Sequence, residues 1–403
     1  MTNPSLDSLH GLSVGDALGA QFFVPGTVLG IDPPAPWPWT DDTEMACSVH
    51  AALTERDAGR FARTLDSFDL THAFARRHDF DRGYGPAANR LLRLVREGGD
   101  ARALAGELFD GQGSYGNGAA MRVAPLGAAF ASDPGAAVRP AAATAVITHT
   151  HPQAVDGAVA VAVAAAHAVR ARTAPGTPAE FLTAVRALTP RGAVYEALGE
   201  ARALLDEPDP VAVARILGNG SRVSALDTVP FALWCAARWL DDYRGAVLAA
   251  IRAGGDVDTT AAIVGGVVAA RTGVAGIPRA WLEAREALPH WAFPGLGSVA
   301  GPVDGQRPML LPRRHPVPPD LRWSDQEWQR LRRGLTGRWA SRTEEGVLHL
   351  YRARTGYEVL SVAVVPARDG SWRPVELLVE THPARFTGAQ DEELLALLLR
   401  RMP

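Results

Sequence analysis

The chain has 403 residues and a formal net charge of −3, with 47% hydrophobic and 21% charged residues. This length can bury a large core and is typical of more than one domain. The composition is that of a soluble globular protein, and the near-neutral charge argues against nucleic-acid binding through bulk electrostatics.

The first residues and the most apolar stretch both argue against export or membrane insertion. Met1–His10 has no basic region followed by an apolar run, so we expect no secretory signal. Ala154–Val169 is interrupted by Asp156 and His167 and is too short and too polar to span a bilayer. We therefore expect a cytoplasmic protein with no membrane partner.

The first 300 residues predict an all-α domain. Ala, Leu, Arg and Glu recur with apolar spacings of three and four, which is the pattern of helices packed on one another. Ala158–Ala164 alternates Ala and Val, so this helix presents small residues on every side and belongs in the middle of a compact multi-helix core. The segments that favour helix are Met45–Thr54, Ala87–Arg96, Val155–Ala171, Pro178–Ala187, Val194–Leu205, Val229–Trp239, Tyr243–Ala253 and Thr260–Arg271.

The pattern changes after residue 300. Residues 301–319 are rich in Pro and predict an extended linker. Residues 320–403 predict a small α+β domain of unknown role, for which we consider substrate recognition, docking of a protein partner, or a structural brace. Its expected elements are a helix starting at Ser324–Glu327, strands Val347–Tyr351, Tyr357–Val365 and Pro374–Val379, a hairpin turn at Asp369-Gly370, and a final helix Gln390–Arg401.

Two acidic clusters stand at the starts of Ala-rich helical patterns. The first is Thr40-Asp41-Asp42-Thr43, and the second is Asp256-Val257-Asp258-Thr259 after the turn residues Gly254-Gly255. Each has an ordinary interpretation as a helix cap, because Asp41 and Glu44 have capping-box spacing and acidic residues favour helix N-termini. Taken alone, each cluster favours capping or remains ambiguous.

If the fold brings the two clusters together, they predict a cation-binding site. Four carboxylates and adjacent hydroxyls are hard oxygen ligands that suit Mg²⁺, Mn²⁺ or Ca²⁺. Two like charges about 4 Å apart repel by roughly 4 kcal/mol at an effective dielectric near 20. Such a pocket requires protons or cations, and two divalent ions would cancel the charge. A two-metal hydrolase is therefore our first hypothesis.

Two further motifs lie between the clusters. Gly113–Arg122 is a Gly-rich polar loop whose backbone can approach a ligand closely, although it lacks the fingerprints of a P-loop. Thr148-His149-Thr150-His151 carries two His one residue apart. A transition-metal site is one interpretation, and we favour the other, in which one ring lines a pocket through hydrogen bonds.

Five motifs in this order resemble the ADP-ribosylglycohydrolase family, which includes the dinitrogenase-reductase-activating glycohydrolase. They are Gly11–Gly19, Thr40–Thr43, Gly113–Arg122, Thr148-His149 and Gly254–Thr259. The resemblance spans about residues 9–275 and does not cover the last hundred residues. It implies an all-α fold with two divalent cations, Mg²⁺ or Mn²⁺, in a cleft.

The resemblance also implies a role for each matching residue. The metal ligands would be Thr40, Asp41, Asp42, Asp256, Asp258 and Thr259, with Asp41, Asp42 and Asp258 catalytic. Asp81 sits where some members place another active-site Asp. The diphosphate and distal ribose of ADP-ribose would meet Ser114, Tyr115, Gly116, Asn117, Gly118 and Met121, and His149 would lie near the adenosine half. The expected reaction cleaves the glycosidic bond between ADP-ribose and an acceptor.

One position departs from the family pattern. Many members have a Glu four residues after the second Gly of the Gly-Asp-Ala-x-Gly motif, and Phe23 stands there in this chain. The departure has two interpretations: the site binds ADP-ribose or a nucleotide without hydrolysis, or a metal-bound hydroxide oriented by Asp41, Asp42 or Asp81 carries out the reaction. We favour the active site, because all four carboxylates of the clusters remain. A separate alternative is a related hydrolase that acts on a small ribosyl metabolite.

Overall fold

The computed structural model describes residues 3–54, 69–292, 309, 312–317, 321–332, 339–352, 358–367 and 369–380. The chain divides into two compact units, Met1–Leu288 and Pro289–Pro403. The sequence predicts this boundary at residue 300. The first unit ends earlier, a few residues after its last α-helix.

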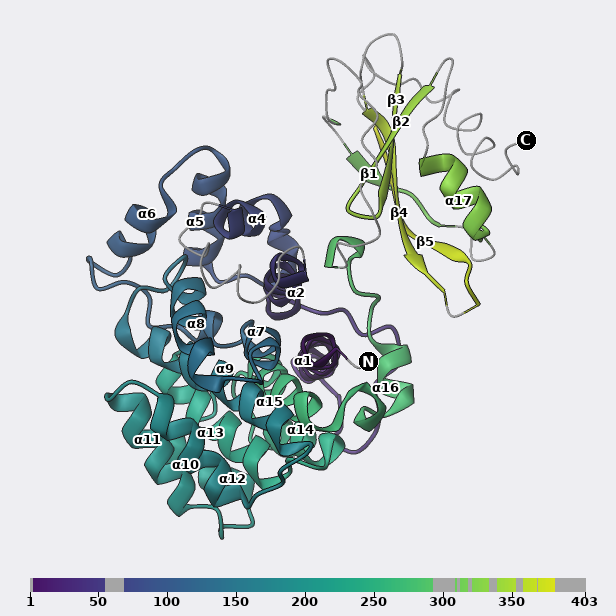
Figure 1. Cartoon of the computed structure of the whole chain (residues 1–403). Coiled ribbons are helices and arrows are strands. Elements are labelled where there is room, and N and C mark those ends of the chain that lie inside the picture. The colour runs from purple at the N-terminus through teal and green to yellow at the C-terminus, as the bar shows by residue number, and fades with distance from the viewer. Residues whose placement is uncertain are drawn as a thin grey trace. The chain divides into compact units, whose positions relative to one another are not determined.

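Unit 1 is mostly helical and confirms the predicted all-α class (Figure 1). Each of the eight segments predicted as helix falls largely within an observed helix, with ends that differ by a few residues. The helices are α1 (Pro4–Gln21), α2 (Asp41–Thr54), α4 (Asp69–Arg77), α5 (Pro86–Arg96), α6 (Ala101–Glu107), α7 (Ala124–Ala129), α8 (Val138–Ala145), α9 (Pro152–Ala171), α10 (Pro178–Leu188), α11 (Ala193–Ala203), α12 (Pro210–Leu217), α13 (Ala225–Arg238), α14 (Tyr243–Arg252), α15 (Val257–Thr272) and α16 (Arg279–Ala284).

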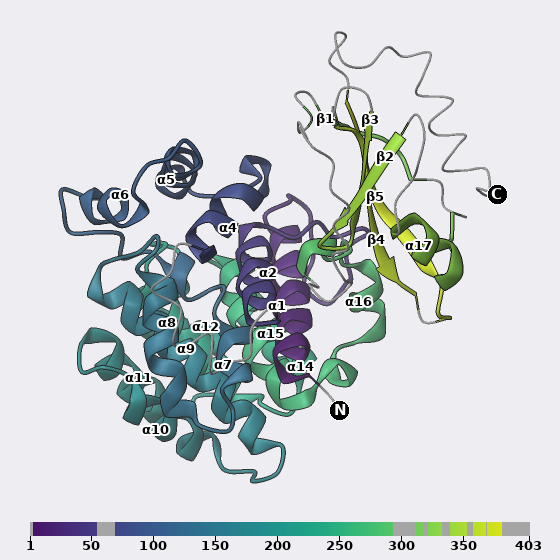
Figure 2. The same ribbon diagram turned by 45° about the horizontal axis from the view of Figure 1, so that its top comes forward.

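Helices α1 and α15 lie side by side at the centre of unit 1 (Figures 1 and 2). Gly11, Gly15 and Gly19 form a stripe on α1 at intervals of four residues, which places them on one face. A Cβ atom on Gly15 would lie 2.1 Å from the carbonyl oxygen of Ala261, and one on Gly19 would lie 2.5 Å from that of Val257. The backbones of the two helices are therefore in direct contact, with no room for a side chain between them.

Helix α9 is long and apolar enough to cross a membrane by length and composition alone. The expectation that this stretch is too short to span is therefore not supported by the helix itself. Burial gives the better explanation, because 72% of its most apolar window is covered by the rest of the protein. This is the property of a core helix, and the small Ala and Val side chains allow α7, α8, α13 and α15 to pack closely on it.

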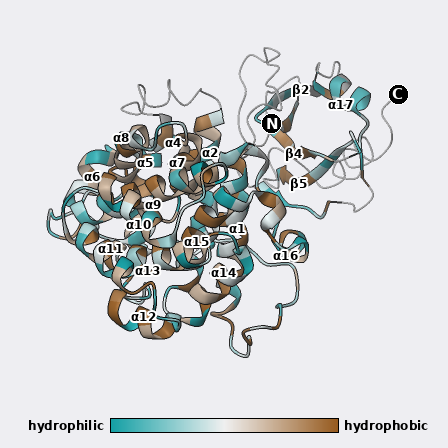
Figure 3. Ribbon diagram, turned by 60° about the horizontal axis from the view of Figure 1, so that its bottom comes forward, coloured by the Kyte–Doolittle hydropathy of each residue, from teal (hydrophilic) through white to brown (hydrophobic). Residues whose placement is uncertain are grey.

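Unit 2 contains a five-stranded antiparallel sheet with the strand order β1-β5-β4-β3-β2. Its elements are β1 (Pro312–Arg314), α17 (Asp325–Arg332), β2 (Trp339–Glu344), β3 (Val347–Arg352), β4 (Glu358–Pro366) and β5 (Trp372–Glu380). Trp328 and Leu331 of α17 pack in one buried cluster with apolar residues of β3, β4 and β5. Figure 3 shows the hydrophobic character of β4, which is buried along most of its length.

Several expectations for the tail are confirmed and others need correction. The helix after Ser324, the three predicted strands and the hairpin turn, where Gly370 has φ +80°, are all present. Residues 312–314 lie in the expected linker but form edge strand β1, which pairs with β5, and β2 was not predicted. Tyr357 and the final helix Gln390–Arg401 lie outside the described residues.

Candidate functional site

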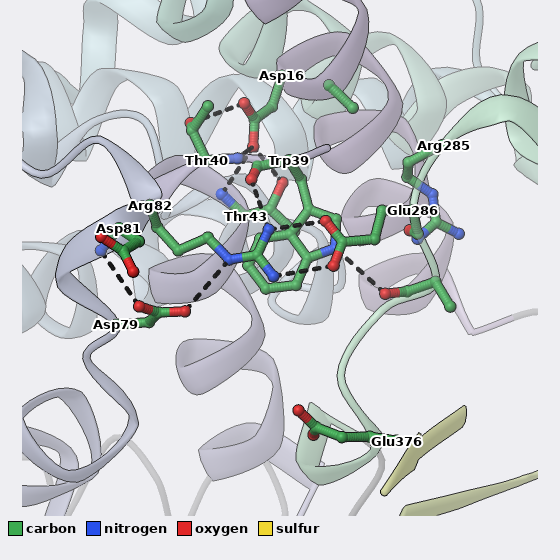
Figure 4. A network of polar contacts seen from close by, with 12 residues as sticks. Asp16, Trp39, Thr40, Thr43, Asp79, Asp81, Arg82, Arg285, Glu286 and Glu376 are labelled. Atoms are coloured by element: carbon green, nitrogen blue, oxygen red, sulfur yellow. Dashed lines mark hydrogen bonds and ion pairs between the residues drawn. The ribbon is translucent and has the colours of Figure 1, made fainter. Parts of the chain in front are cut away.

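The first acidic cluster is held in place by a buried carboxylate on α1. Asp16 accepts hydrogen bonds from the backbone N–H of Thr40 (2.9 Å) and Thr43 (3.1 Å) and from their hydroxyls (2.7 and 2.5 Å) (Figure 4). Asp16 therefore fixes the start of α2, the turn that presents Asp41 and Asp42. Sequence reasoning did not assign a role to Asp16, although the Gly11–Gly19 motif contains it.

The second cluster follows a turn that only glycine adopts easily. Gly254 and Gly255 have φ of +67° and +80°, and a Cβ on Gly255 would lie 2.3 Å from the carbonyl oxygen of Asn219. The turn brings Asp256 to the N-cap position of α15, where its side chain makes no capping hydrogen bond. It accepts instead from the amide of Asn117 at 2.6 Å.

The structure brings the two clusters together. The hydroxyl of Thr259 lies 3.4 Å from Oδ2 of Asp42, and one carboxylate oxygen from each of Asp16, Asp42 and Asp258 lies within 4.8 Å of the others. Oδ1 of Asp42 is buried and has no hydrogen-bond partner among the described residues. A buried acceptor without a donor is costly for a protein, and this one is free to coordinate a cation.

The capping interpretation does not account for the first cluster either. Glu44 does not turn back to the start of α2, as a capping box would require. Its carboxylate accepts from the hydroxyl of Tyr84 (2.6 Å) and the backbone N–H of Asp79 (3.1 Å). Glu44 and Asp256 therefore do not cap their helices, whereas Oδ1 of Asp258 accepts from the backbone N–H of Thr259 (2.8 Å) in the first turn of α15.

Burial and mutual repulsion disfavour the charged forms of these carboxylates. Burial, followed by the charge of Asp16, raises the pKa of Asp41 to about 8. The same two causes raise the pKa of Asp42 well above its ordinary value, and burial followed by Asp256 raises the pKa of Asp258 well above its own. The cluster therefore holds protons at neutral pH unless cations compensate its charge.

A cavity of about 430 Å³ joins the clusters to the Gly-rich loop. This volume suits a small-molecule ligand. The predicted site residues that line it are Asp41, Asp42, Ser114, Tyr115, Gly116, Asn117, Gly118, Met121, His149, Asp256, Asp258 and Thr259. Ligand contact is thus open to every predicted residue except Thr40 and Asp81.

Those two residues lie at the edge of the site. Thr40 stands behind Asp42, and its hydroxyl contacts the carboxylates of Asp16 and Asp42. Asp81 is exposed, and its backbone N–H donates to Asp79 at 3.2 Å (Figure 4). Within the described part of the chain Asp81 does not line the cavity, so its geometry gives no support to a catalytic role.

Phe109 and Tyr115 form an aromatic surface at the cavity that was not predicted from the sequence. The rings of Phe109 and Tyr115 lie 5.6 Å apart, and His151 meets Tyr115 edge-on at 5.8 Å. Phe109 and Tyr115 line the cavity and remain 49% and 42% exposed. Phe109 follows a helix in an irregular loop with φ +52°, so no periodic pattern in the sequence marks it.

An arginine clamp supports the cavity wall from outside. Arg82 donates to both carboxylate oxygens of Glu286 (2.7 and 2.9 Å) and to the carbonyl of Trp39 (3.0 Å), and its guanidinium lies 3.5 Å from the centroid of the Trp39 ring (Figure 4). Trp39 directly precedes Thr40, and Gly83 lines the cavity. The clamp thus ties two parts of the site to the end of unit 1.

The family model described as ADP-ribosylglycohydrolase matches residues 5–300, about three quarters of the chain and all of the site above. The chain belongs to the ADP-ribosylglycohydrolase family. This confirms the resemblance drawn from the five motifs. The family match ends before the sheet of unit 2.

Individual relatives agree with this assignment. ADP-ribosylhydrolase ARH3 of Bos taurus is 28% identical over 335 residues, covering 69% of this chain and 87% of its own length. ADP-ribosyl-[dinitrogen reductase] glycohydrolase of Rhodospirillum rubrum is 28% identical over 70% of this chain and 92% of its own length. A solved ADP-ribosylglycohydrolase-related protein complex matches with a TM-score of 0.52 and 28% identity, over 70% of this chain and 92% of that one.

Proposed function

We propose that this family member is a metal-dependent ADP-ribosyl hydrolase, which cleaves the glycosidic bond between ADP-ribose and an acceptor and releases ADP-ribose. Its membership makes it a hydrolase of the ADP-ribosylglycohydrolase type. The observation that carries the proposal is the convergence of both acidic clusters and the Gly-rich loop on one cavity. A site of this kind can hold cations at one end and a polar ligand along its wall.

The donor set fits two divalent cations, Mg²⁺ or Mn²⁺. The residues that would hold them are Asp41, Asp42, Asp256, Asp258 and Thr259, which line the cavity and offer hard oxygen atoms. Thr40, the sixth predicted ligand, would join them only through a hydroxyl that contacts the carboxylates of Asp16 and Asp42 in this structure. The partnerless Oδ1 of Asp42 and the raised pKa values of Asp41 and Asp258 support cation binding, because positive charge would relieve both. Asp16 already accepts four hydrogen bonds, so we assign it the positioning of Thr40 and Thr43.

Bound cations would supply Lewis acidity and lower the pKa of a water molecule in the site. The remaining tasks belong to the protein. Asp41, Asp42 and Asp258 orient the reacting groups where the two clusters line the cavity. Asn117 uses its amide to hold Asp256 and Thr228, at 2.6 and 3.1 Å, so it couples the substrate loop to the second cluster. Tyr115 and Phe109 line the cavity with exposed rings, and we assign them to a nucleobase, which stacks on aromatic rings, in place of the diphosphate and distal ribose that the resemblance implied for Tyr115.

Phe23 is the residue that favours the non-hydrolytic alternative. Its side chain is 56% exposed and is not among the described residues that line the cavity. The position where many relatives have Glu therefore contributes no carboxylate. Glu44 is not a substitute, because it is not among the described residues that line the cavity, and its Oε2 accepts from both the Tyr84 hydroxyl and the backbone N–H of Asp79. We favour hydrolysis because all four carboxylates of the two clusters remain.

The deciding experiment measures ADP-ribose release from arginine-, serine- and nucleic-acid-linked substrates with Mg²⁺, with Mn²⁺ and with a chelator. We expect metal-dependent release from at least one linkage. The matched variant is Asp258→Asn, which keeps the side-chain shape and should abolish release. Binding of ADP-ribose without release from any substrate would establish the non-hydrolytic module, and release from small ribosyl metabolites alone would establish the third function.

A further inference from the structure

Arg122 is a completely buried cation beside the cavity, and neutral groups hold it. Its Nη2 donates to the carbonyl oxygen of Thr144 at 2.7 Å and to the hydroxyl oxygen of Thr148 at 3.0 Å. Its guanidinium lies 4.7 Å from the ring centroid of Phe74, and Nη1 faces the sulfur of Met45 at 3.3 Å. No carboxylate is among these partners in the described part of the chain. The donors of Arg122 therefore constrain where the protons of the neighbouring Thr148 and His149 lie.

The hydroxyl of Thr148 transmits this effect to His149. Arginine has donors but no acceptor, so the oxygen of Thr148 accepts from Arg122. The hydroxyl oxygen of Thr148 also lies 2.7 Å from Nδ1 of His149, and no other described residue offers an acceptor to its proton, so the arrangement that satisfies this buried hydroxyl donates the proton to Nδ1. An Nδ1 atom that accepts a hydrogen bond carries no proton. A neutral imidazole at this position must therefore carry its proton on Nε2.

The surroundings also keep the ring neutral. Burial, followed by the nearby charge of Arg122, lowers the pKa of His149 to about 3. The Nε2 edge faces the substrate loop, because Cβ atoms added to Gly116 and Gly118 would lie 3.2 and 3.0 Å from Nε2. The ring lines the cavity, and Nε2 makes no hydrogen bond to another described residue. This leaves one donor directed at whatever occupies the space beside the loop.

We propose that Arg122 and Thr148 are positioning residues that hold His149 in its Nε2–H tautomer, as a fixed hydrogen-bond donor to an acceptor atom of the ligand. The identity of the ligand rests on the proposed function, which makes the acceptor an oxygen or ring nitrogen of ADP-ribose. The tautomer itself does not depend on any ligand. The two parts can therefore be tested separately.

The first test is the ¹⁵N spectrum of the histidine rings in the full-length protein without ligand. The signals of His149 are assigned by their loss in His149→Gln. We expect a protonated Nε2 and an unprotonated Nδ1 in the wild type. Thr148→Val removes the hydroxyl and should lose this single-tautomer signature, whereas Thr148→Ser should keep it. The matched control is Thr144→Val, which removes a buried hydroxyl but leaves the Thr144 carbonyl that Arg122 uses.

The second test is calorimetric titration of the same proteins with ADP-ribose. Loss of one oriented donor should weaken binding about tenfold in His149→Gln and Thr148→Val, which corresponds to about 1.4 kcal/mol. Thr148→Ser and Thr144→Val should remain close to the wild type.

Two results would overturn the inference. One is a wild-type His149 with the proton on Nδ1, a result that requires only the assignment variant His149→Gln to fold. The other is a Thr148→Val protein that retains both the spectrum and the affinity of the wild type. Failure of the wild type to bind ADP-ribose would refute both ADP-ribose as the ligand and the proposed function. The spectra would still show whether Arg122 and Thr148 hold His149 in its Nε2–H tautomer.

Discussion

Replacing Asp42 by Asn should make the cation-free protein more stable while it removes the response to cations. The change keeps the shape of the side chain and deletes one charge from a cluster whose oxygens lie within 4.8 Å of one another. At an effective dielectric near 20, repulsion between two such charges is about 3 kcal/mol. At pH 8 the unfolded chain holds Asp42 ionised, so proton uptake in the folded protein does not relieve this cost, and we expect a gain of up to about 3 kcal/mol in the free energy of unfolding.

The assay is thermal unfolding in chelator and in excess Mg²⁺, together with turnover. In chelator, Asp42→Asn should melt a few degrees above the wild type. With Mg²⁺ at a hundredfold of its dissociation constant the wild type should gain about 2.7 kcal/mol, and the variant should gain little and show no turnover. Asp206→Asn, which changes an exposed carboxylate in the turn after α11, should match the wild type in both conditions.

Two results would refute this reasoning. A variant that is less stable than the wild type in chelator would mean that the buried carboxylate is satisfied in the cation-free protein. A variant that keeps the Mg²⁺-dependent stabilisation and turnover would mean that Asp42 is not a ligand.

Other changes test other parts of the site. Arg82→Lys keeps the charge but cannot form the bidentate contact with Glu286 or the stacking on Trp39, so the free energy of unfolding should fall by about 1–2 kcal/mol and turnover should fall with it. The exposed control Arg279→Lys should change little, and equal melting curves for the two variants would contradict the role of the Arg82 clamp. Tyr115→Ala should weaken ADP-ribose about tenfold in calorimetry and leave ribose 5-phosphate nearly unchanged, since stacking on a base contributes about 1–3 kcal/mol; equal losses for both ligands would count against a base at this ring. Burial lowers the pKa of His50 to about 4, so between pH 4 and 6.5 the unfolded chain binds a proton that the folded chain does not, and stability rises with pH. His50→Gln should therefore reduce the slope of unfolding free energy against pH by up to about 1.4 kcal/mol per unit in that window, and parallel curves would disprove the linkage.

The helices of unit 1 were predictable where their apolar residues follow the helical period. Helix α1 gave a weaker signal because its buried face includes polar residues such as Ser8, Ser13 and Asp16, so no apolar stripe appears. Edge strand β1 was missed because Pro312 and two arginines resemble a linker, and an edge position tolerates both proline and charge.

The site was predictable in its residue types but not in its arrangement. The acidic residues and the Gly-rich loop were visible as motifs, and the resemblance supplied their common location. Asp16 and Arg82 were missed because their importance depends on neighbours more than 20 residues away, Thr40 for Asp16 and Glu286 for Arg82, and Phe109 was missed because it lies in an irregular loop. Side-chain partners at such separations leave no local pattern in one sequence.

The backbone contact between α1 and α15 has a consequence for how variants of this protein would be interpreted. Asp16 lies next to Gly15 on α1, and Asp258 lies on the first turn of α15, so the distance between these helices sets the separation between carboxylates that are more than 200 residues apart in the sequence. The hydrogen atom of each glycine acts as a spacer with no smaller replacement. A methyl group at Gly15 would force the helices apart and spread the cluster. Such a variant would behave as an active-site mutant although it alters no polar atom, and a pathogenicity or fitness screen would find it among residues that never touch the ligand.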